Sequence, residues 1–309
     1  MERRPIGSLS VSLVGVGCNN FGRRIDAAGT EAVVDAAVEA GINFFDTADI
    51  YGGTQSEELL GKALAGRRDD VIIATKFGMG DGTKLPAGAS AASIAAAAEG
   101  SLRRLGTDRI DLYQIHAPDD STPIDETLEA MDRLVRDGKV LEIGCSNFDG
   151  PRLDDAASAA EKHGTARFVS VQNELSLLRR RGEADLLASA QRHDLAILPY
   201  FPLASGVLTG KYRRGETPPA GTRIGSMEAG DQEKALSAKR FDVVEALDAF
   251  AGERGHTLLE LAMSWLASLP NLASVIAGAT KPEQVRANVA AVGWTLTDDD
   301  RARIGEIAG

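Results

Sequence analysis

Residues 71–116 contain VIIATK (71–76), ASIAAAAEGSLRRLG (92–106) and RIDLYQIH (109–116). The first and third segments are short, apolar on consecutive positions and rich in β-branched residues, which is typical of strands buried on both faces. The second has a helical pattern and ends in Gly, the residue preferred just past a helix end. A strand, a helix and a second strand form the unit from which parallel sheets are built.

The same alternation continues on both sides of this unit. Helical patterns occur at 30–41, 56–66 and 125–138, and Ser56 is expected to be the N-cap of the second of these, with Glu57 and Glu58 in its first turn. Eight strand–helix alternations favour an α/β fold with either a closed barrel or a doubly wound sheet. The remaining strand-like segments are VSLVGVG (11–17), INFFDT (42–47), VLEIGCSN (140–147), FVSVQNEL (168–175), AILPYFPL (196–203) and ASVIAGAT (273–280).

One stretch interrupts the alternation. Residues 204–234 are rich in Gly, Pro and charge and lack periodicity, so they are expected to form a long functional or mobile loop. Two extra helical patterns follow at 235–253 and 257–268, before the last strand, and Pro282 suits the first turn of another helix near the C-terminus. We therefore expect one (β/α)8 TIM barrel, spanning residues 1–309 as a single domain, with extra helices before the last strand and near the C-terminus.

Composition excludes several classes of protein. The chain has 309 residues and a formal net charge of -11, which argues against a nucleic-acid partner because phosphate binding needs a positive footprint. Its two cysteines, Cys18 and Cys145, are isolated, and we expect Cys145 to be a small buried residue and the protein to be cytoplasmic. No signal peptide, membrane span or metal-binding motif is recognisable.

Polar side chains end nearly every expected strand. In a barrel these ends lie on one face, where the active sites of such folds occur. The competing Rossmann fold finds only weak support in GVGCNNFG (15–22), because Asn20 stands where the third glycine belongs. The polar residues at the strand ends are Asn19, Asn20, Asp46, Lys76, His116, Ser146, Asn147, Gln172, Asn173, Tyr200, Thr280 and Lys281.

The sequence resembles the aldo-keto reductase family. The motifs that carry this resemblance occur in the family's order along nearly the whole chain: INFFDTADIYGGTQSEELLG, VIIATKFG, RIDLYQIHAPD, IGCSNF, VQNEL, YFPLASGVLTGKY and IAGATKPEQVRANVAA. The resemblance implies reduction of aldehydes or ketones to alcohols by hydride transfer from a nicotinamide cofactor, NADPH or its oxidised form NADP, with NADH as a possible alternative. The partner it implies is a small-molecule carbonyl substrate.

The family's catalytic tetrad would be Asp46, Tyr51, Lys76 and His116. Tyr51 would be the general acid for the oxygen of the reduced carbonyl, and Lys76 would lower the pKa of its hydroxyl. Asp46 would hold Lys76 in place, and His116 would orient the carbonyl oxygen. Each residue alone also has an ordinary structural explanation, such as a turn cap, a loop aromatic or a solvated lysine.

The resemblance also implies a cofactor site. Ser146, Asn147 and Gln172 would hold the nicotinamide carboxamide, and Tyr200 would stack on its ring. A glycine-containing segment would cover the pyrophosphate, and the N-terminus of the helix at Pro282 would receive the adenosine end. The residues of these last two regions are Leu203, Ser205, Gly206, Leu208, Gly210, Lys211, Gly278, Thr280, Lys281, Gln284 and Asn288.

Other features leave alternatives open. Gln284 stands where many relatives have Arg, so Lys281 becomes the expected contact for a 2′-phosphate. A cofactor-binding regulatory subunit and a barrel isomerase or aldolase are rival functions. Substrate choice is expected to depend on loops at 20–21, 77–88 and 204–234. The chain has 21 residues after Asn288, so we expect a relatively open pocket.

Overall fold

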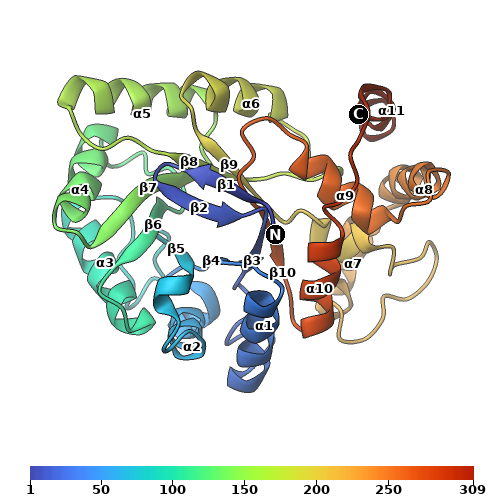
Figure 1. Cartoon of the computed structure of the whole chain (residues 1–309), viewed down its shortest axis with the longest axis horizontal. Helices are drawn as coiled ribbons and strands as arrows, with labels where there is room; N and C mark the ends of the chain where they lie inside the picture. Colours follow the sequence, from blue (N-terminus) through green and yellow to red (C-terminus); the bar gives the residue numbers. More distant parts are fainter.

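In the computed structural model, which describes residues 1–309, eight parallel strands form a central barrel and helices surround it (Figure 1). The ring closes next to β9, where Ile197 N donates to Asn271 O (2.8 Å) and Ala273 N donates to Ile197 O (3.0 Å). The (β/α)8 barrel is therefore confirmed, and the doubly wound and Rossmann alternatives are wrong. The strands, in the order in which they pair, are β10 (Val275–Gly278), β3 (Val14–Gly17), β4 (Phe44–Asp46), β5 (Ile72–Phe77), β6 (Ile110–Ile115), β7 (Val140–Ser146), β8 (Ser170–Glu174) and β9 (Ala196–Tyr200).

Local sequence explains where the surrounding helices begin and end. The Ser90 side chain, for example, accepts a hydrogen bond from Ser93 N at the start of α3, and Gly106 ends that helix with a φ of 64°. Ser56 is not the N-cap of α2, as the sequence suggested. Thr54 occupies that position, and the Ser56 hydroxyl donates to Cys18 O (2.9 Å). The barrel helices are α1 (Ala27–Glu39), α2 (Gln55–Ala63), α3 (Ala91–Leu105), α4 (Ile124–Arg136), α5 (Gly150–His163), α6 (Glu183–Arg192), α9 (Leu258–Ala267) and α10 (Pro282–Ala290).

A β-hairpin precedes the barrel and was not expected from the sequence. Strands β1 (Arg3–Ile6) and β2 (Leu9–Ser12) pair antiparallel and lie across one end of the barrel (Figure 1). The run 11–17 is therefore not one strand, because the chain leaves β2 at Ser12 and enters β3 at Val14. The Arg4 guanidinium donates to Ala267 O (2.9 Å) and Leu272 O (3.0 Å), which fastens the hairpin at the N-terminal ends of the strands. The opposite end stays available for a functional site.

The segment 204–234 is more ordered than its sequence suggested. It contains two 3₁₀ turns, η3 (Ala204–Thr209) and η4 (Ile224–Ser226), and most of helix α7 (Ala229–Ala235), so the expectation of an irregular loop is wrong in part. Val207, Leu208, Tyr212 and Ile224 are buried in the main apolar core, although their spacing follows no regular period.

The extra helices before the last strand and near the C-terminus are confirmed. They include α8 (Ala238–Gly252), and α11 (Asp298–Ala308) packs beside it, outside the ring (Figure 1). The remaining 3₁₀ turns are η1 (Tyr51–Thr54) and η2 (Arg68–Asp70). None of the helices combines the length and the apolar character needed to cross a membrane.

Candidate active site

Asp46 and Lys76 form a buried ion pair at the open end of the barrel. Lys76 Nζ lies 2.7 Å from Asp46 Oδ2 and 2.8 Å from Oδ1, and it also donates to Thr47 O (2.9 Å). The two side chains are only 1% and 4% exposed. Burial alone lowers the pKa of Lys76, but Asp46 and Tyr51 outweigh it, so the pKa is raised. The ammonium therefore keeps its charge, because neighbouring strands β4 and β5 place its counter-ion beside it.

Tyr51 faces this pair because the chain turns sharply just after it. Gly52 and Gly53 have φ values of 60° and 64°, and a Cβ on Gly52 would lie 2.6 Å from Phe21 O. Only glycine fits there without strain. Lys76 Nζ lies 5.1 Å from the centre of the Tyr51 ring.

The electrostatics of Tyr51 differ from expectation. Burial raises the pKa of Tyr51, and although Lys76 lowers it as expected, the net pKa is raised. Lys76 thus acts in the expected direction, but its effect is smaller than desolvation of the phenolate, and Asp46 offsets part of its charge. Tyr51 consequently retains its proton through the neutral pH range.

His116 follows β6 and completes the group. Its ring packs edge-on against Tyr51, with 5.7 Å between ring centres. Burial and, to a lesser degree, Lys76 lower the pKa of His116 to about 3, so the imidazole is neutral at physiological pH. Its Nδ1 is buried without a hydrogen-bond partner. A neutral imidazole carries one N–H and can donate it to an uncharged acceptor.

Two glutamines extend the polar network under the pair. Gln172 Nε2 donates to Asp46 Oδ1 (2.7 Å), and Ser146 Oγ donates to Gln172 O (2.8 Å). Gln114, on β6, also reaches Asp46 Oδ1 (3.5 Å), and the sequence reasoning missed it. A signal was present, because Gln114 precedes His116 by two positions and such residues point to the same face of a strand.

Asn147 and Tyr200 connect the next strand ends. Asn147 Nδ2 donates to His116 O (2.9 Å), and the Tyr200 hydroxyl donates to Asn147 Oδ1 (2.8 Å). Asn147 has a φ of 62°, a left-handed conformation that asparagine tolerates better than most residues. The structure thus brings together the expected side chains from β4 through β9 around one opening.

The segment 203–224, called the strap below, borders this opening and carries unpaired cations. Lys211 and Arg223 have no carboxylate partner, and the Arg223 guanidinium lies 4.5 Å from the centre of the Phe201 ring. Arg24 Nη2 donates to Gly221 O (2.8 Å), which ties the β3–α1 loop to the strap. Unpaired cations in an acidic chain fit an anionic ligand such as the phosphates of a dinucleotide.

The backbone of the strap also suits a close ligand approach. Ser205 and Gly206 have φ values of 62° and 91°, so the chain there is locally left-handed and departs from helical geometry. The other expected residues of the strap lie in or next to the 3₁₀ turn η3. They are Leu203, Leu208, Gly210 and Lys211.

The expected adenosine end lies where β10 meets α10. Gly278 ends the strand, Lys281 is the exposed N-cap of the helix and Pro282 begins it. The Gln284 side chain accepts a hydrogen bond from Thr280 N (2.7 Å). Asn288, one turn further on, is 5% exposed.

Several other candidate residues lie elsewhere. His163 ends α5, and His193, at the end of α6, lies 2.6 Å from Asp154 Oδ1, as expected for residues at helix C-termini. His256 instead stacks on Trp294, with 4.1 Å between ring centres. Cys18 and Cys145 are both fully buried, so Cys145 is a buried residue as expected.

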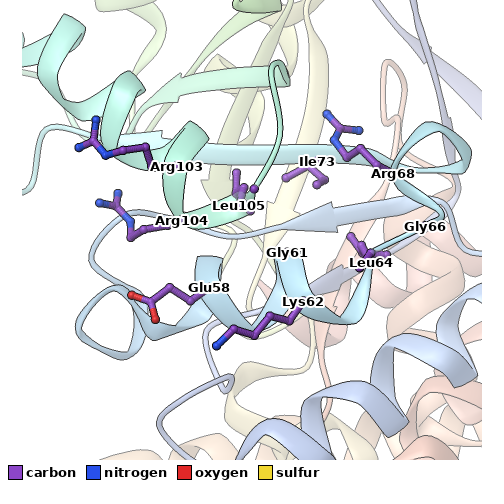
Figure 2. A pocket seen from close by; sticks show the side chains of 12 residues that line it. Glu58, Gly61, Lys62, Leu64, Gly66, Arg68, Ile73, Arg103, Arg104 and Leu105 are labelled. Carbon is purple, nitrogen blue, oxygen red and sulfur yellow. The ribbon is translucent and has the colours of Figure 1, made fainter.

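A cavity of about 700 Å³ between α2 and α3 does not belong to this site (Figure 2). It lies outside the barrel, near the ends of both helices. Lys62 and Arg103 occupy the last helical turns, where cations offset the helix dipole. Arg68 pairs with Asp111. These charges are accounted for without a ligand.

Comparison with known proteins matches this arrangement to one family. The profile of the Aldo/keto reductase family matches residues 13–308. The chain belongs to this family. It is an NAD(P)H-dependent oxidoreductase, and the family's reaction is the reduction of carbonyl groups with a nicotinamide cofactor.

Individual relatives of this aldo-keto reductase carry different names. It is 36% identical to the Aldo-keto reductase YhdN of Bacillus subtilis, over 89% of this chain and 82% of the relative. It is also 36% identical to the Uncharacterized oxidoreductase YrpG of the same organism, over 99% and 96%. A Probable voltage-gated potassium channel subunit beta of Oryza sativa is 35% identical over 88% and 84%.

Proposed function

We propose that this aldo-keto reductase uses NADPH to reduce a small aldehyde or ketone to its alcohol, with Tyr51 as the general acid. The observation that carries the proposal is the convergence of Tyr51, His116 and the Asp46–Lys76 pair at one end of the barrel. We further propose that residues 1–309 act as one barrel domain.

Each side chain has a distinct task in this proposal. A bound nicotinamide supplies the hydride to the carbonyl carbon. Tyr51 gives its proton to the carbonyl oxygen as charge develops there, and Lys76 stabilises the phenolate that results. Asp46 holds the ammonium within reach. His116, neutral because of its low pKa of about 3, donates a hydrogen bond that orients the oxygen.

The cofactor would lie along the strand ends from β7 to β10. Asn147 and Gln172 would bind the carboxamide beside Ser146, and Tyr200 would pack against the ring. The strap with Ser205, Gly206 and Lys211 would hold the pyrophosphate, and the start of α10 would bind the adenosine end. The unpaired Arg223 and Lys211 support an anionic ligand at the strap.

A regulatory role is the second candidate, because relatives include proteins named as potassium channel beta subunits. Multiple-turnover oxidation of NADPH with a reactive aldehyde such as nitrobenzaldehyde decides between the two. We expect sustained absorbance loss that depends on both enzyme and aldehyde. Tight NADPH binding with no turnover on a broad panel of aldehydes and ketones would contradict the enzymatic proposal.

Lys281→Ala is expected to weaken NADPH binding more than NADH binding. Only NADPH carries the 2′-phosphate, and a charge-assisted contact contributes about 1.5–3 kcal/mol, or roughly tenfold to a hundredfold in affinity. Fluorescence titration of both cofactors measures the ratio, and Lys239→Ala, an exposed lysine on α8, is the matched control. Equal loss for both cofactors would shift the assignment to Arg286 or Arg223.

A further inference from the structure

A carboxyl group that the proposed chemistry does not use belongs to the short segment that leads into Tyr51. Asp49 follows Asp46 by three positions and precedes Tyr51 by two, and its side chain is fully buried. Neither carboxyl oxygen accepts a well-formed hydrogen bond, although the nearby backbone N–H of Ile50 favours the ionised form. Its backbone N–H donates to Lys76 O (3.1 Å), so its segment is tied to the strand that carries the proposed catalytic lysine. An ionised carboxylate in this environment would be strongly unfavourable.

A second fully buried carboxyl group, that of Glu57 on α2, lies near enough to disfavour ionisation of Asp49. Glu57 accepts hydrogen bonds from Thr75 Oγ1 (2.6 Å) and from Arg104 Nε (2.7 Å). Arg104, the cation that α3 contributes, is therefore already engaged by Glu57, and it is one of the residues that line the cavity in Figure 2. This cluster of Asp49, Glu57 and Arg104 thus contains two buried carboxyl groups and one arginine. Because Arg104 is bound to Glu57, Asp49 has no counter-ion of its own.

The remaining charged and titratable groups around Asp49 come from the barrel strands. Lys76 on β5 is bound by Asp46 on β4. Tyr113 on β6 is fully buried, and its hydroxyl also lacks a hydrogen-bond partner. Burial and then Glu57 raise the pKa of Asp49 to about 7, against the opposing effects of Arg104, the backbone N–H of Ile50 and Lys76.

The proposed catalytic groups themselves do not titrate in the neutral range. The pKa of His116 is lowered to about 3, and the pKa values of Tyr51 and Lys76 are raised. Between about pH 5 and pH 9 these three residues keep one protonation state. Asp49 is the group within the Tyr51 segment whose charge changes within that interval.

We infer that Asp49 is a positioning residue. As a neutral acid, its buried side chain anchors the segment 47–54 and so holds Tyr51 in place, and loss of its proton disturbs this segment and lowers turnover. The inference rests on the proposed function for its effect on rate, but its effect on the segment does not depend on turnover.

The rate test is a pH profile of kcat at saturating NADPH and aldehyde. The unmodified protein should lose activity as the pH rises from about 6 to about 9, approaching about tenfold per pH unit above the midpoint if the ionised form is inactive. Asp49→Asn mimics the neutral acid and should remove this step, whereas Asp70→Asn, at an exposed carboxylate, should keep it. A flat profile in the unmodified protein, or the same step in Asp49→Asn, would overturn the inference.

Two neighbouring substitutions should move the midpoint in opposite directions. Glu57→Gln removes the charge that disfavours ionisation of Asp49, so the step should move to lower pH. Arg104→Gln removes a charge that favours ionisation, so the step should move to higher pH. A purely structural role for the cluster would lower activity in both variants without opposite shifts, and that result would count against the inference.

Hydrogen exchange separates failure of the inference from failure of the proposed function. Exchange of residues 47–54, corrected for its intrinsic pH dependence, should increase between about pH 6 and about pH 9 in the unmodified protein and not in Asp49→Asn. This measurement needs no turnover. If the protein proves inactive, unequal exchange in the two proteins still supports the positioning role, and equal exchange overturns it.

Discussion

Tyr51→Phe is expected to abolish carbonyl reduction while leaving NADPH affinity nearly unchanged. The phenylalanine ring keeps the packing against His116, whose ring centre lies 5.7 Å away, so the fold and the cofactor groove should survive. Only the hydroxyl proton is lost. Loss of a positioned general acid costs about 10²–10⁴ in rate, or roughly 3–5 kcal/mol of barrier.

Steady-state turnover with nitrobenzaldehyde and a fluorescence titration with NADPH, made on the same preparation, check this result. Tyr212→Phe is a matched control, because it removes a buried hydroxyl that accepts from Ile224 N (3.3 Å) in the strap. Retained turnover in Tyr51→Phe would show that another residue supplies the proton. Loss of NADPH binding would show that Tyr51 acts mainly on the cofactor site.

Lys76→Met should both inactivate the protein and destabilise it. The substitution leaves Asp46 ionised and buried, with only the amides of Gln172 and Gln114 as donors. Breaking a buried ion pair from one side costs about 3–5 kcal/mol, because an uncompensated charge stays in the interior. Urea unfolding followed by circular dichroism measures the change in free energy.

The double variant Asp46→Asn/Lys76→Met separates the two effects. It removes both charges, and the amide oxygen of the new asparagine side chain would still accept from Gln172, so most of the lost stability should return. Activity should not return, because no ammonium remains to stabilise the Tyr51 phenolate. A Lys76→Met protein as stable as the unmodified one would contradict the buried-pair interpretation.

The fold was largely predictable because its signals are local and repeated. Buried parallel strands appear as short apolar runs, and the glycine at position 106 ends α3 as its place after the helical pattern indicated. The N-terminal hairpin was missed because Leu9–Ser12 merges with the apolar run of β3. Helix α7 was missed because it is short and contributes no buried residue that would give it a periodic pattern.

The sequence predicted most residues of the candidate site, but it predicted their pKa values and buried contacts less well. Asp46, Lys76 and His116 each end a strand, and the parallel order of the barrel brings such ends together. The sequence could not show that burial outweighs Lys76 at Tyr51, because desolvation depends on every atom packed around the ring. Gln114 and Asp49 were overlooked since their importance depends on neighbours distant in the chain.

The sequence by itself determined the strand–helix alternation, the face that carries the polar residues and the family, because these depend on residue type and spacing along the chain. Only the tertiary structure decided which buried charged groups have a counter-ion and which do not. Glu57 appears in the sequence as a first-turn helix residue, yet in the fold it is fully buried, is bound by Arg104 and disfavours ionisation of Asp49. The interaction between these charged groups depends on their separation and on the exclusion of water. Both are set only when α2, α3 and the barrel wall pack together.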